Sequence, residues 1–172
     1  MRIAAAAVDV VSRWGIEGLT HRRVAAAVGV PLGSMTYHFS SLEDLLKVAI
    51  ELAASRNKGF WDQWSANLPA DPDLPEELTT LLVDVFTSKK RSRTIVQAEL
   101  YLAAIRRPSL RAASVAWGRV IFDALLRHTD AATARALSLM LDSLSFESLV
   151  VGKTPSREDC LAMFRRVQSE RQ

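Results

Sequence analysis

Small polar and aromatic side chains follow a break in an alanine-rich segment near the start of the chain. Residues 20–39 read THRRVAAAVGVPLGSMTYHF, and Gly29 and Pro31 interrupt a run that could otherwise continue as one helix. From Leu19 to Ser41 the chain has two arginines, two histidines and no acidic residue, although its formal net charge is only +3. Such a segment is where phosphate contacts are expected, although a solvated helix face explains its charge equally well.

The residues around the break predict two short helices joined by a tight turn. Thr20 is suited to cap a helix over residues 21–28, and the glycine that follows is suited to end it. Pro31 has no N–H to lose at a helix start, so it can open a second helix over residues 31–38. With a first helix over residues 2–14 packed across them, these elements form a helix-turn-helix, whose second short helix enters the DNA major groove.

The rest of the chain is predicted to be helical, which places the protein in the all-α class. Hydrophobic residues make up 49% of the sequence and only seven residues are glycine, a composition that favours helices. Prolines and aspartates predict a loop at 67–75, and the basic SKKRSR stretch at 88–93 predicts an exposed turn that could touch DNA. Beyond the first three helices, apolar spacing indicates a helix capped by Ser40 or Ser41, then helices over 76–87, 94–106, 109–128 and 131–151, and a last one that Thr154 and Pro155 start.

The fourth helix has two possible N-terminal caps. Either Ser40 or Ser41 can cap it, and the Ser40–Glu43 pair fits a capping box better. Its buried stripe is expected to begin with Leu42, and the stripe of the first helix to include Trp14. Three aromatic residues either extend the fourth helix or form a separate short one: Phe60, Trp61 and Trp64.

Several classes of protein are disfavoured by what the sequence lacks. Cys160 is the single cysteine, so no internal disulfide can form, and we expect it to be a packing residue. The three histidines lie far apart, without the spacing of a metal site. No uncharged apolar stretch is long enough to span a membrane, and no nucleophile elbow or phosphate loop occurs. We therefore expect a cytoplasmic protein that needs no metal or cofactor and is not an enzyme.

The N-terminal sequence resembles the TetR family of transcriptional regulators over roughly its first 50 residues. The pattern is far more specific than a generic helix-turn-helix. Weaker similarity lies in ELYLAAIRRPSLR, residues 99–111, which looks like the ligand-binding half of many such regulators. The residues that carry the resemblance are Ile3 and the alanines of the first helix, Gly15, Gly18-Leu19-Thr20, residues 24–27, Gly29-Val30, Gly33-Ser34, Tyr37-His38-Phe39 and Leu45-Leu46.

The resemblance implies a DNA-binding surface on and around the two short helices. Thr20 would cap the first of them and contact phosphate, and Tyr37 is the residue we most expect to touch DNA. The family usually has lysine, tyrosine and lysine where this chain has Leu32, Thr36 and Leu42, and Lys47 could replace the last of these contacts. The full set of expected DNA-binding residues is Thr20, Arg22, Arg23, Leu32, Gly33, Ser34, Thr36, Tyr37, His38 and Lys47.

The resemblance also implies a homodimer, with DNA bound by residues 1–50 and a small-molecule effector bound by residues 51–172. Independently, the helix over 131–151 is apolar on more than one side, so either a second subunit or the interior of a monomer must cover it. A pocket in this half would be lined by apolar and aromatic residues, with Gln97, Glu99 and Tyr101 able to orient a ligand. The candidates for effector binding are Trp61, Trp64, Phe86, Tyr101, Trp117, Phe122, Met140 and Phe146, each of which could instead be an ordinary core residue.

Two functions from different classes follow from these observations. The leading hypothesis is a dimeric regulator, most simply a repressor, that a small-molecule effector releases from a palindromic operator. The alternative is a helical dimer that binds small molecules and whose helix-turn-helix no longer reads DNA, because lysines are missing at positions 32 and 42.

Overall fold

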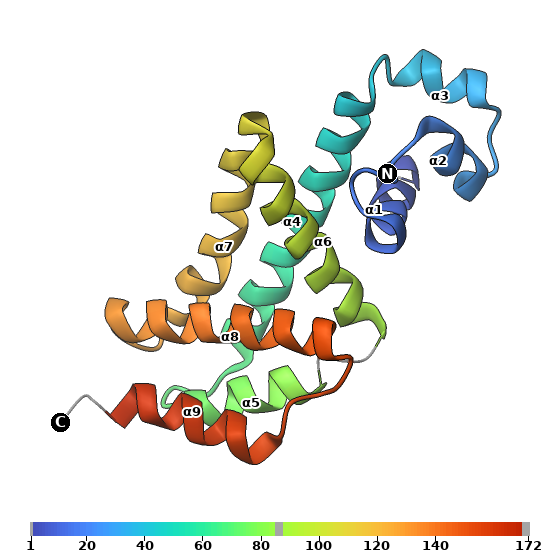
Figure 1. The fold of residues 1–172 in the computed structure, drawn as a ribbon. Helices are drawn as coiled ribbons and strands as arrows, with labels where there is room; N and C mark the ends of the chain where they lie inside the picture. Colours follow the sequence, from blue (N-terminus) through green and yellow to red (C-terminus); the bar gives the residue numbers. More distant parts are fainter. Residues whose placement is uncertain (1, 85–87, 170–172) are drawn as a thin grey trace.

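The computed structural model describes residues 2–84 and 88–169, with the side chains of 84 and 88–90 left out, and these residues form nine α-helices, one 3₁₀ helix and no strand (Figure 1). The all-α architecture expected from the sequence is confirmed. No described helix is both long and apolar enough to cross a membrane. The elements are α1 Arg2–Trp14, α2 His21–Val28, α3 Leu32–His38, α4 Leu42–Asn67, α5 Leu74–Asp84, α6 Ser88–Arg106, η1 Pro108–Leu110, α7 Arg111–Leu125, α8 Ala131–Val151 and α9 Arg157–Ser169.

The two short helices begin and end through the local chemistry that the sequence predicts. The Thr20 hydroxyl accepts a hydrogen bond from the Arg23 N–H at 3.1 Å and caps α2. Gly29 ends α2 in the left-handed conformation, with φ of 72°, which glycine adopts without steric cost. Pro31 keeps an extended ψ of 143°, so it precedes α3 as the N-cap and does not form its first turn.

The capping box of α4 is formed by Ser41 and Asp44, so the prediction of Ser40 with Glu43 is wrong. The Ser41 hydroxyl accepts from the Asp44 N–H at 3.0 Å, and the Asp44 carboxylate accepts from the Ser41 N–H at 3.1 Å. The Ser40 hydroxyl donates to the same carboxylate at 2.9 Å. The Ser41 hydroxyl itself donates to this carboxylate at 2.8 Å, and the hydrogen bonds from the Ser41 and Ser40 hydroxyls hold the pKa of Asp44 below its usual value.

We expect Ser41→Ala to lower the free energy of unfolding by about 1 kcal/mol, because one N-terminal N–H of α4 loses its acceptor. Urea denaturation followed by circular dichroism measures the change. Ser40→Ala is the matched control, since Ser40 bonds the carboxylate but no backbone group, and it should cost less. An equal loss in both variants would contradict the assignment of the cap.

The first hydrophobic core joins the N-terminal helices to α6 and the start of α7. Fully or almost fully buried side chains come from every helix involved, among them Val10 of α1, Val24 of α2, Met35 of α3, Leu45 of α4 and Leu100 of α6. The N-terminal unit is therefore packed against the body of the protein and is not an independent appendage.

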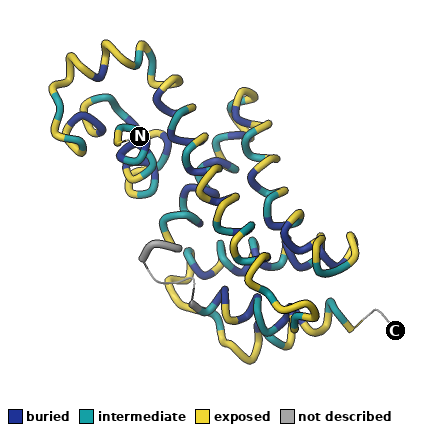
Figure 2. The backbone as a smooth tube through the Cα atoms, turned by 180° about the vertical axis from the view of Figure 1, so that it is seen from behind, coloured by how far each residue is buried: buried dark blue, intermediate teal, exposed yellow. Residues whose placement is uncertain are grey.

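The second hydrophobic core lies at the opposite end of the molecule, where α5, α8 and α9 pack together (Figure 1). It contains Trp61 of α4, Leu78 of α5, Leu125 of α7, Leu137 of α8 and Phe164 of α9. Cys160 is fully buried here as a packing residue, as expected. The 26 residues of α4 connect the two cores, so the aromatic residues near its end extend this helix. Buried positions run along its whole length (Figure 2).

Two side chains predicted to be buried are exposed. Trp14 is 52% exposed, with its ring under the guanidinium of Arg23 at 5.4 Å. Leu42 is 44% exposed because it occupies the first turn of α4, before that helix meets α1. In both cases the regular spacing of apolar residues extends beyond the part of the helix that packs against its neighbours.

The stretch predicted as an exposed turn at 88–93 is helical instead. It forms the start of α6, which runs from Ser88 to Arg106. The Arg93 guanidinium lies 3.8 Å from the centre of the Phe60 ring, and burial lowers its pKa to about 10, so it remains a cation at neutral pH. The packing of this arginine side chain explains why a basic sequence forms a helix here.

Other helix limits also differ from the prediction. The helix predicted over 109–128 is α7, preceded by the 3₁₀ turn η1 and ending at Leu125. The helix predicted over 76–87 begins earlier, at Leu74, and the predicted end lies outside the described residues. The last helix begins at Arg157, after Thr154 and Pro155.

Candidate functional site

The helix α3 presents almost its whole surface to solvent. Met35 is its single buried residue, with an exposed fraction of 0%, and it anchors the helix to the first core. Tyr37 is 86% exposed, and its only ring contact is an edge-on one with His38, at 5.3 Å between centroids. Gly33, Ser34 and the other polar residues of α3 are exposed as well (Figure 2). Because Met35 alone of the α3 side chains is buried, the others are available to bind a partner.

Some side chains of α2 and α3 already make contacts within the protein, and others do not. Arg23 donates to the backbone carbonyl of Gly18 and stacks over Trp14, so it supports the turn before α2. Arg22 is exposed. The Thr36 hydroxyl donates to the carbonyl of Gly33 at 3.1 Å. The sequence did not reveal this structural role of Arg23, because its partners lie at the end of α1 and in the turn that follows.

The remaining expected DNA-binding residues lie on the same end of the molecule. Thr20 is the cap of α2, and Leu32, 41% exposed, begins α3. Lys47 lies on the exposed side of α4, one turn after its capping box. The structure thus brings all ten residues onto two short helices and the adjoining turn of α4 (Figure 1).

Polar contacts tie this N-terminal unit to α6 and the turn after it. The Ile16 N–H donates to the Glu99 carboxylate at 2.8 Å, across 83 residues of sequence. Gly15 permits this approach: its φ is +71°, and a Cβ atom there would lie 2.8 Å from a Glu99 oxygen. Beyond the end of α6, Arg107 pairs with Glu17 at 2.6 Å. The Ser109 hydroxyl also donates to Glu43 of α4, at 3.1 Å.

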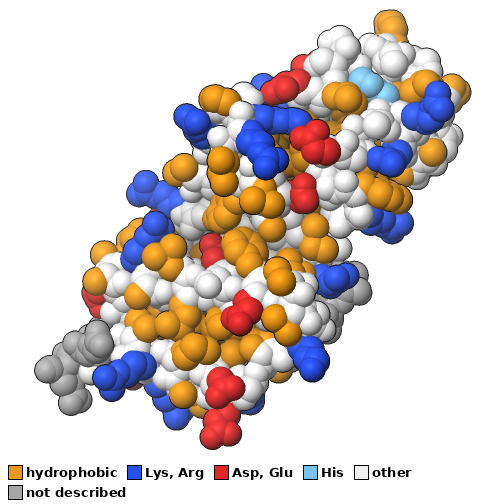
Figure 3. All heavy atoms as spheres, viewed as in Figure 1, with side chains coloured by type: hydrophobic (Ala, Val, Ile, Leu, Met, Phe, Trp, Pro, Cys, Tyr) orange, Lys and Arg blue, Asp and Glu red, His pale blue; other side chains and the backbone are white. Residues whose placement is uncertain are grey.

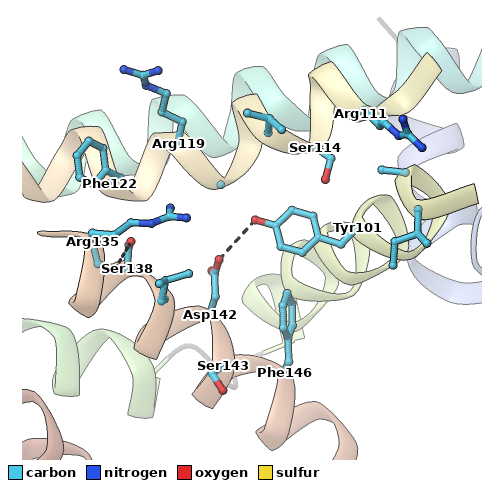
Figure 4. A pocket seen from close by; sticks show the side chains of 15 residues that line it. Tyr101, Arg111, Ser114, Arg119, Phe122, Arg135, Ser138, Asp142, Ser143 and Phe146 are labelled. Carbon is cyan, nitrogen blue, oxygen red and sulfur yellow. Dashed lines mark hydrogen bonds between the residues drawn. The ribbon is translucent and has the colours of Figure 1, made fainter. Parts of the chain in front are cut away.

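A groove of about 1100 Å³ opens between α6, α7 and α8. This volume lies just above the usual range for small-molecule sites, about 300–1000 Å³. Figure 4 shows Tyr101 of α6, Phe122 of α7 and Phe146 of α8 around it. Three residues predicted to bind effector therefore line one groove.

The polar side chains of the groove centre on Asp142. Its carboxylate accepts from the Gln97 amide at 2.9 Å, and the Tyr101 hydroxyl lies at 3.5 Å from its other oxygen (Figure 4). Burial raises the pKa of Asp142, and burial followed by the charge of Asp142 raises the pKa of Tyr101. Gly118 allows the Tyr101 hydroxyl to approach α7, since a Cβ there would lie 2.6 Å from it. Sequence analysis did not select Asp142, because an isolated acid among apolar residues of a helix gives no local signal.

The other described residues predicted to bind effector lie outside this groove. Trp117 is buried in the first core, and Trp61 in the second. Trp64 and Met140 are half-buried against the second core. Phe86 lies outside the described residues. No group of three described His, Cys, Asp or Glu residues is placed to hold a metal ion.

Two family descriptions match the chain in succession. "Bacterial regulatory proteins, tetR family" matches residues 3–49, and "Tetracyclin repressor-like, C-terminal domain" matches residues 73–170. The chain belongs to the TetR family. TetR regulators bind DNA through the N-terminal helix-turn-helix and are not enzymes, so the resemblance drawn from the sequence is confirmed.

Solved structures of similar proteins share the fold over almost the whole chain. The multidrug binding protein EbrR with proflavin is 38% identical, with 96% of this chain and 97% of that chain covered and a TM-score of 0.75. EbrR with ethidium is 37% identical, covers 96% of each chain and has a TM-score of 0.78. A TetR member from Streptomyces coelicolor A3 is 38% identical, with 96% and 95% covered and a TM-score of 0.79. Among curated proteins, no match is found.

Proposed function

We propose that the protein is a dimeric transcriptional repressor that a small aromatic effector releases from a palindromic operator. The observation that carries the proposal is the exposed surface of α3, anchored by Met35 alone. In a helix-turn-helix this element enters the major groove, while α2 crosses the backbone. The absence of acidic residues from Leu19 to Ser41 favours the approach of phosphates.

The proposed roles divide the chain at about residue 50. Residues 1–50 bind DNA: Arg22, Thr20 and Lys47 contact phosphates, and Ser34, Tyr37 and His38 reach bases or phosphates. Residues 51–172 bind the effector and form the dimer. Acting on DNA, the protein would function in the cytoplasm.

The dimer is proposed to form through the last two long helices. Leu139, Val150 and Val151 of α8 are more than half exposed, and Met163 of α9 is 37% exposed. Hydrophobic side chains gather on the face that carries α8 and α9 (Figure 3). Burial of such a surface between two copies removes apolar area from water. Two copies of α3 would then have to match half-sites about 34–36 Å apart.

The groove between α6, α7 and α8 is the proposed effector site. EbrR, a relative over the whole chain, is solved with the aromatic dyes proflavin, ethidium and malachite green. Because α6 carries Tyr101 in the groove and Glu99 at the turn before α2, a ligand that moves α6 would also move the DNA-binding unit. The effect requires that ligand bind the released state more tightly than the DNA-bound state.

Selection of random double-stranded DNA at low salt tests this function. We expect the purified protein to enrich an inverted repeat, with an affinity that falls steeply as salt rises. Failure of a folded dimer to enrich any sequence would contradict the proposal. That result would favour a ligand-binding dimer without DNA readout, a function that the exposed Leu32 and Leu42 would also fit.

A further inference from the structure

We propose that the groove selects a flat aromatic cation and that the Asp142 carboxylate supplies the counter-charge. The inference rests on the proposed function and deepens it, since it assigns the sign of the effector charge and the residue that reads it.

Asp142 is the one acidic side chain among the described residues that line the groove. Figure 4 shows its carboxylate pointing from α8 into the space between α7 and α8, toward the Tyr101 hydroxyl. The residue is half-buried, so its charge is screened by solvent less than a surface charge would be.

The charge of Asp142 is only partly compensated by the protein. The Gln97 amide makes one good hydrogen bond at 2.9 Å, while the Tyr101 hydroxyl at 3.5 Å is at the limit of hydrogen bonding. Within the described residues, no Lys, Arg or His nitrogen makes a salt bridge with this carboxylate. An ionised carboxylate has about four acceptor positions, so it retains the capacity to bind a cation. The elevated pKa reflects the same deficit of compensation.

The surface beside Asp142 suits a flat ring. Tyr101 and Phe146 meet edge to face, with centroids 5.9 Å apart, and Phe122 lies farther along the groove. Ile105 and Val115 are 72% and 71% exposed at its edge. Aromatic faces attract cations, and exposed aliphatic side chains gain from apolar cover. A planar aromatic cation supplies both the positive charge and the apolar cover.

Three arginines on the groove margin would favour an anion instead, and they must be weighed. Arg111, Arg119 and Arg135 are all exposed, and Arg119 pairs with Asp123 at 3.5 Å. Figure 4 shows Arg119 pointing away from the groove and Arg135 extending into the space between α7 and α8. Exposed charges are screened by water and salt, whereas Asp142 acts from the interior of the groove. An anionic dye is therefore the competitor that discriminates between the two possibilities.

The test is fluorescence titration of the full-length protein, without DNA, using ethidium as a permanent cation and fluorescein as an anion. We expect Asp142→Asn to weaken ethidium binding by about ten- to a hundredfold, because a charge-assisted contact is lost. Fluorescein binding should be unchanged or stronger. Glu147→Gln, an exposed charge on the same helix outside the groove lining, should leave both affinities unchanged.

The pH dependence of ethidium binding gives a second readout. Burial raises the pKa of Asp142, and the nearby charge of Arg135 opposes that effect. The other titratable or charged groups facing the site are Tyr101 and Arg93 on α6 and Arg111 and Arg119 on α7. Ethidium affinity should therefore rise as pH increases through the pKa of Asp142, and Asp142→Asn should abolish the rise.

Loss of fold does not confound the test, because the neutral asparagine replaces a carboxylate whose ionised form burial disfavours. Asp142→Asn should melt at the same temperature as wild type or above it at neutral pH. The inference would be overturned if wild type and Asp142→Asn bound ethidium equally tightly, or if wild type bound fluorescein more tightly than ethidium. Either result would leave an effector site in place. Binding of neither dye would overturn it together with the proposed effector site, and operator selection would still test DNA binding separately.

Discussion

Replacing Tyr37 with alanine is expected to weaken operator binding by the dimer about 10²- to 10⁴-fold without changing its melting temperature. A good base contact is worth about 1–3 kcal/mol, and each dimer would lose two. The side chain is 86% exposed and meets the ring of His38 edge-on, so its removal leaves no cavity in the core. Fluorescence anisotropy with the selected operator measures the affinity, and thermal unfolding measures the fold.

Tyr37→Phe separates the two parts of this side chain. If the hydroxyl bonds a base or phosphate, the phenylalanine variant should lose a large part of the affinity, whereas retained affinity would assign the contact to the ring. The affinity of Tyr37→Ala for random DNA should fall much less, since phosphate contacts dominate nonspecific binding. A Tyr37→Ala protein that binds the operator as tightly as wild type would remove α3 from the proposed DNA interface.

Replacing Glu99 with leucine is expected to abolish most of the effect of effector on operator binding. The Glu99 carboxylate holds the Ile16 N–H at 2.8 Å, directly before the turn that leads to α2. On the same helix, Tyr101 lines the groove. An effector commonly changes the affinity at a second site by about 5- to 150-fold, and in the variant this factor should fall to near one. It should also lose about 1–3 kcal/mol of stability, because a partly buried N–H is left without its acceptor.

Operator affinity measured with and without saturating ethidium, in wild type and in the variant, gives the coupling directly. Glu99→Gln is the matched control, since its amide oxygen still accepts from Ile16, and it should keep most of the coupling. Both variants should bind ethidium as wild type does, because Glu99 does not line the groove. If ethidium released Glu99→Leu from the operator as fully as it releases wild type, the effect of the effector would reach α2 by another route.

The structure shows which kinds of feature could be predicted from sequence. The cap at Thr20 and the left-handed Gly29 depend on neighbouring residues, and both were predicted correctly. The α4 cap was misassigned because Ser40 and Ser41 offer nearly equal local chemistry, and the choice depends on an extended backbone at Ser41. The start of α6 was missed because the Arg93 side chain packs on Phe60, which is 33 positions away in sequence.

The groove was predicted less completely than the DNA-binding surface. Periodicity marks which residues are apolar but does not distinguish a groove from a core. Tyr101, Phe122 and Phe146 line the groove, while Trp117 fills the first core, although all four have similar surroundings in the sequence. The position of Asp142 in the groove could be recognised only from the fold, which places it opposite Tyr101.

The single helix α4 sets a limit on modular engineering of this regulator. Its first half supplies Leu45 and Ala49 to one core and its second half supplies Trp61 to the other, without a flexible linker between them. A chimaera that receives its DNA-binding unit from a relative must therefore be joined inside a helix, with the helical phase preserved. It must also keep a glycine at position 15 and an acceptor at position 99, or the transplanted unit will bind its operator without responding to the effector.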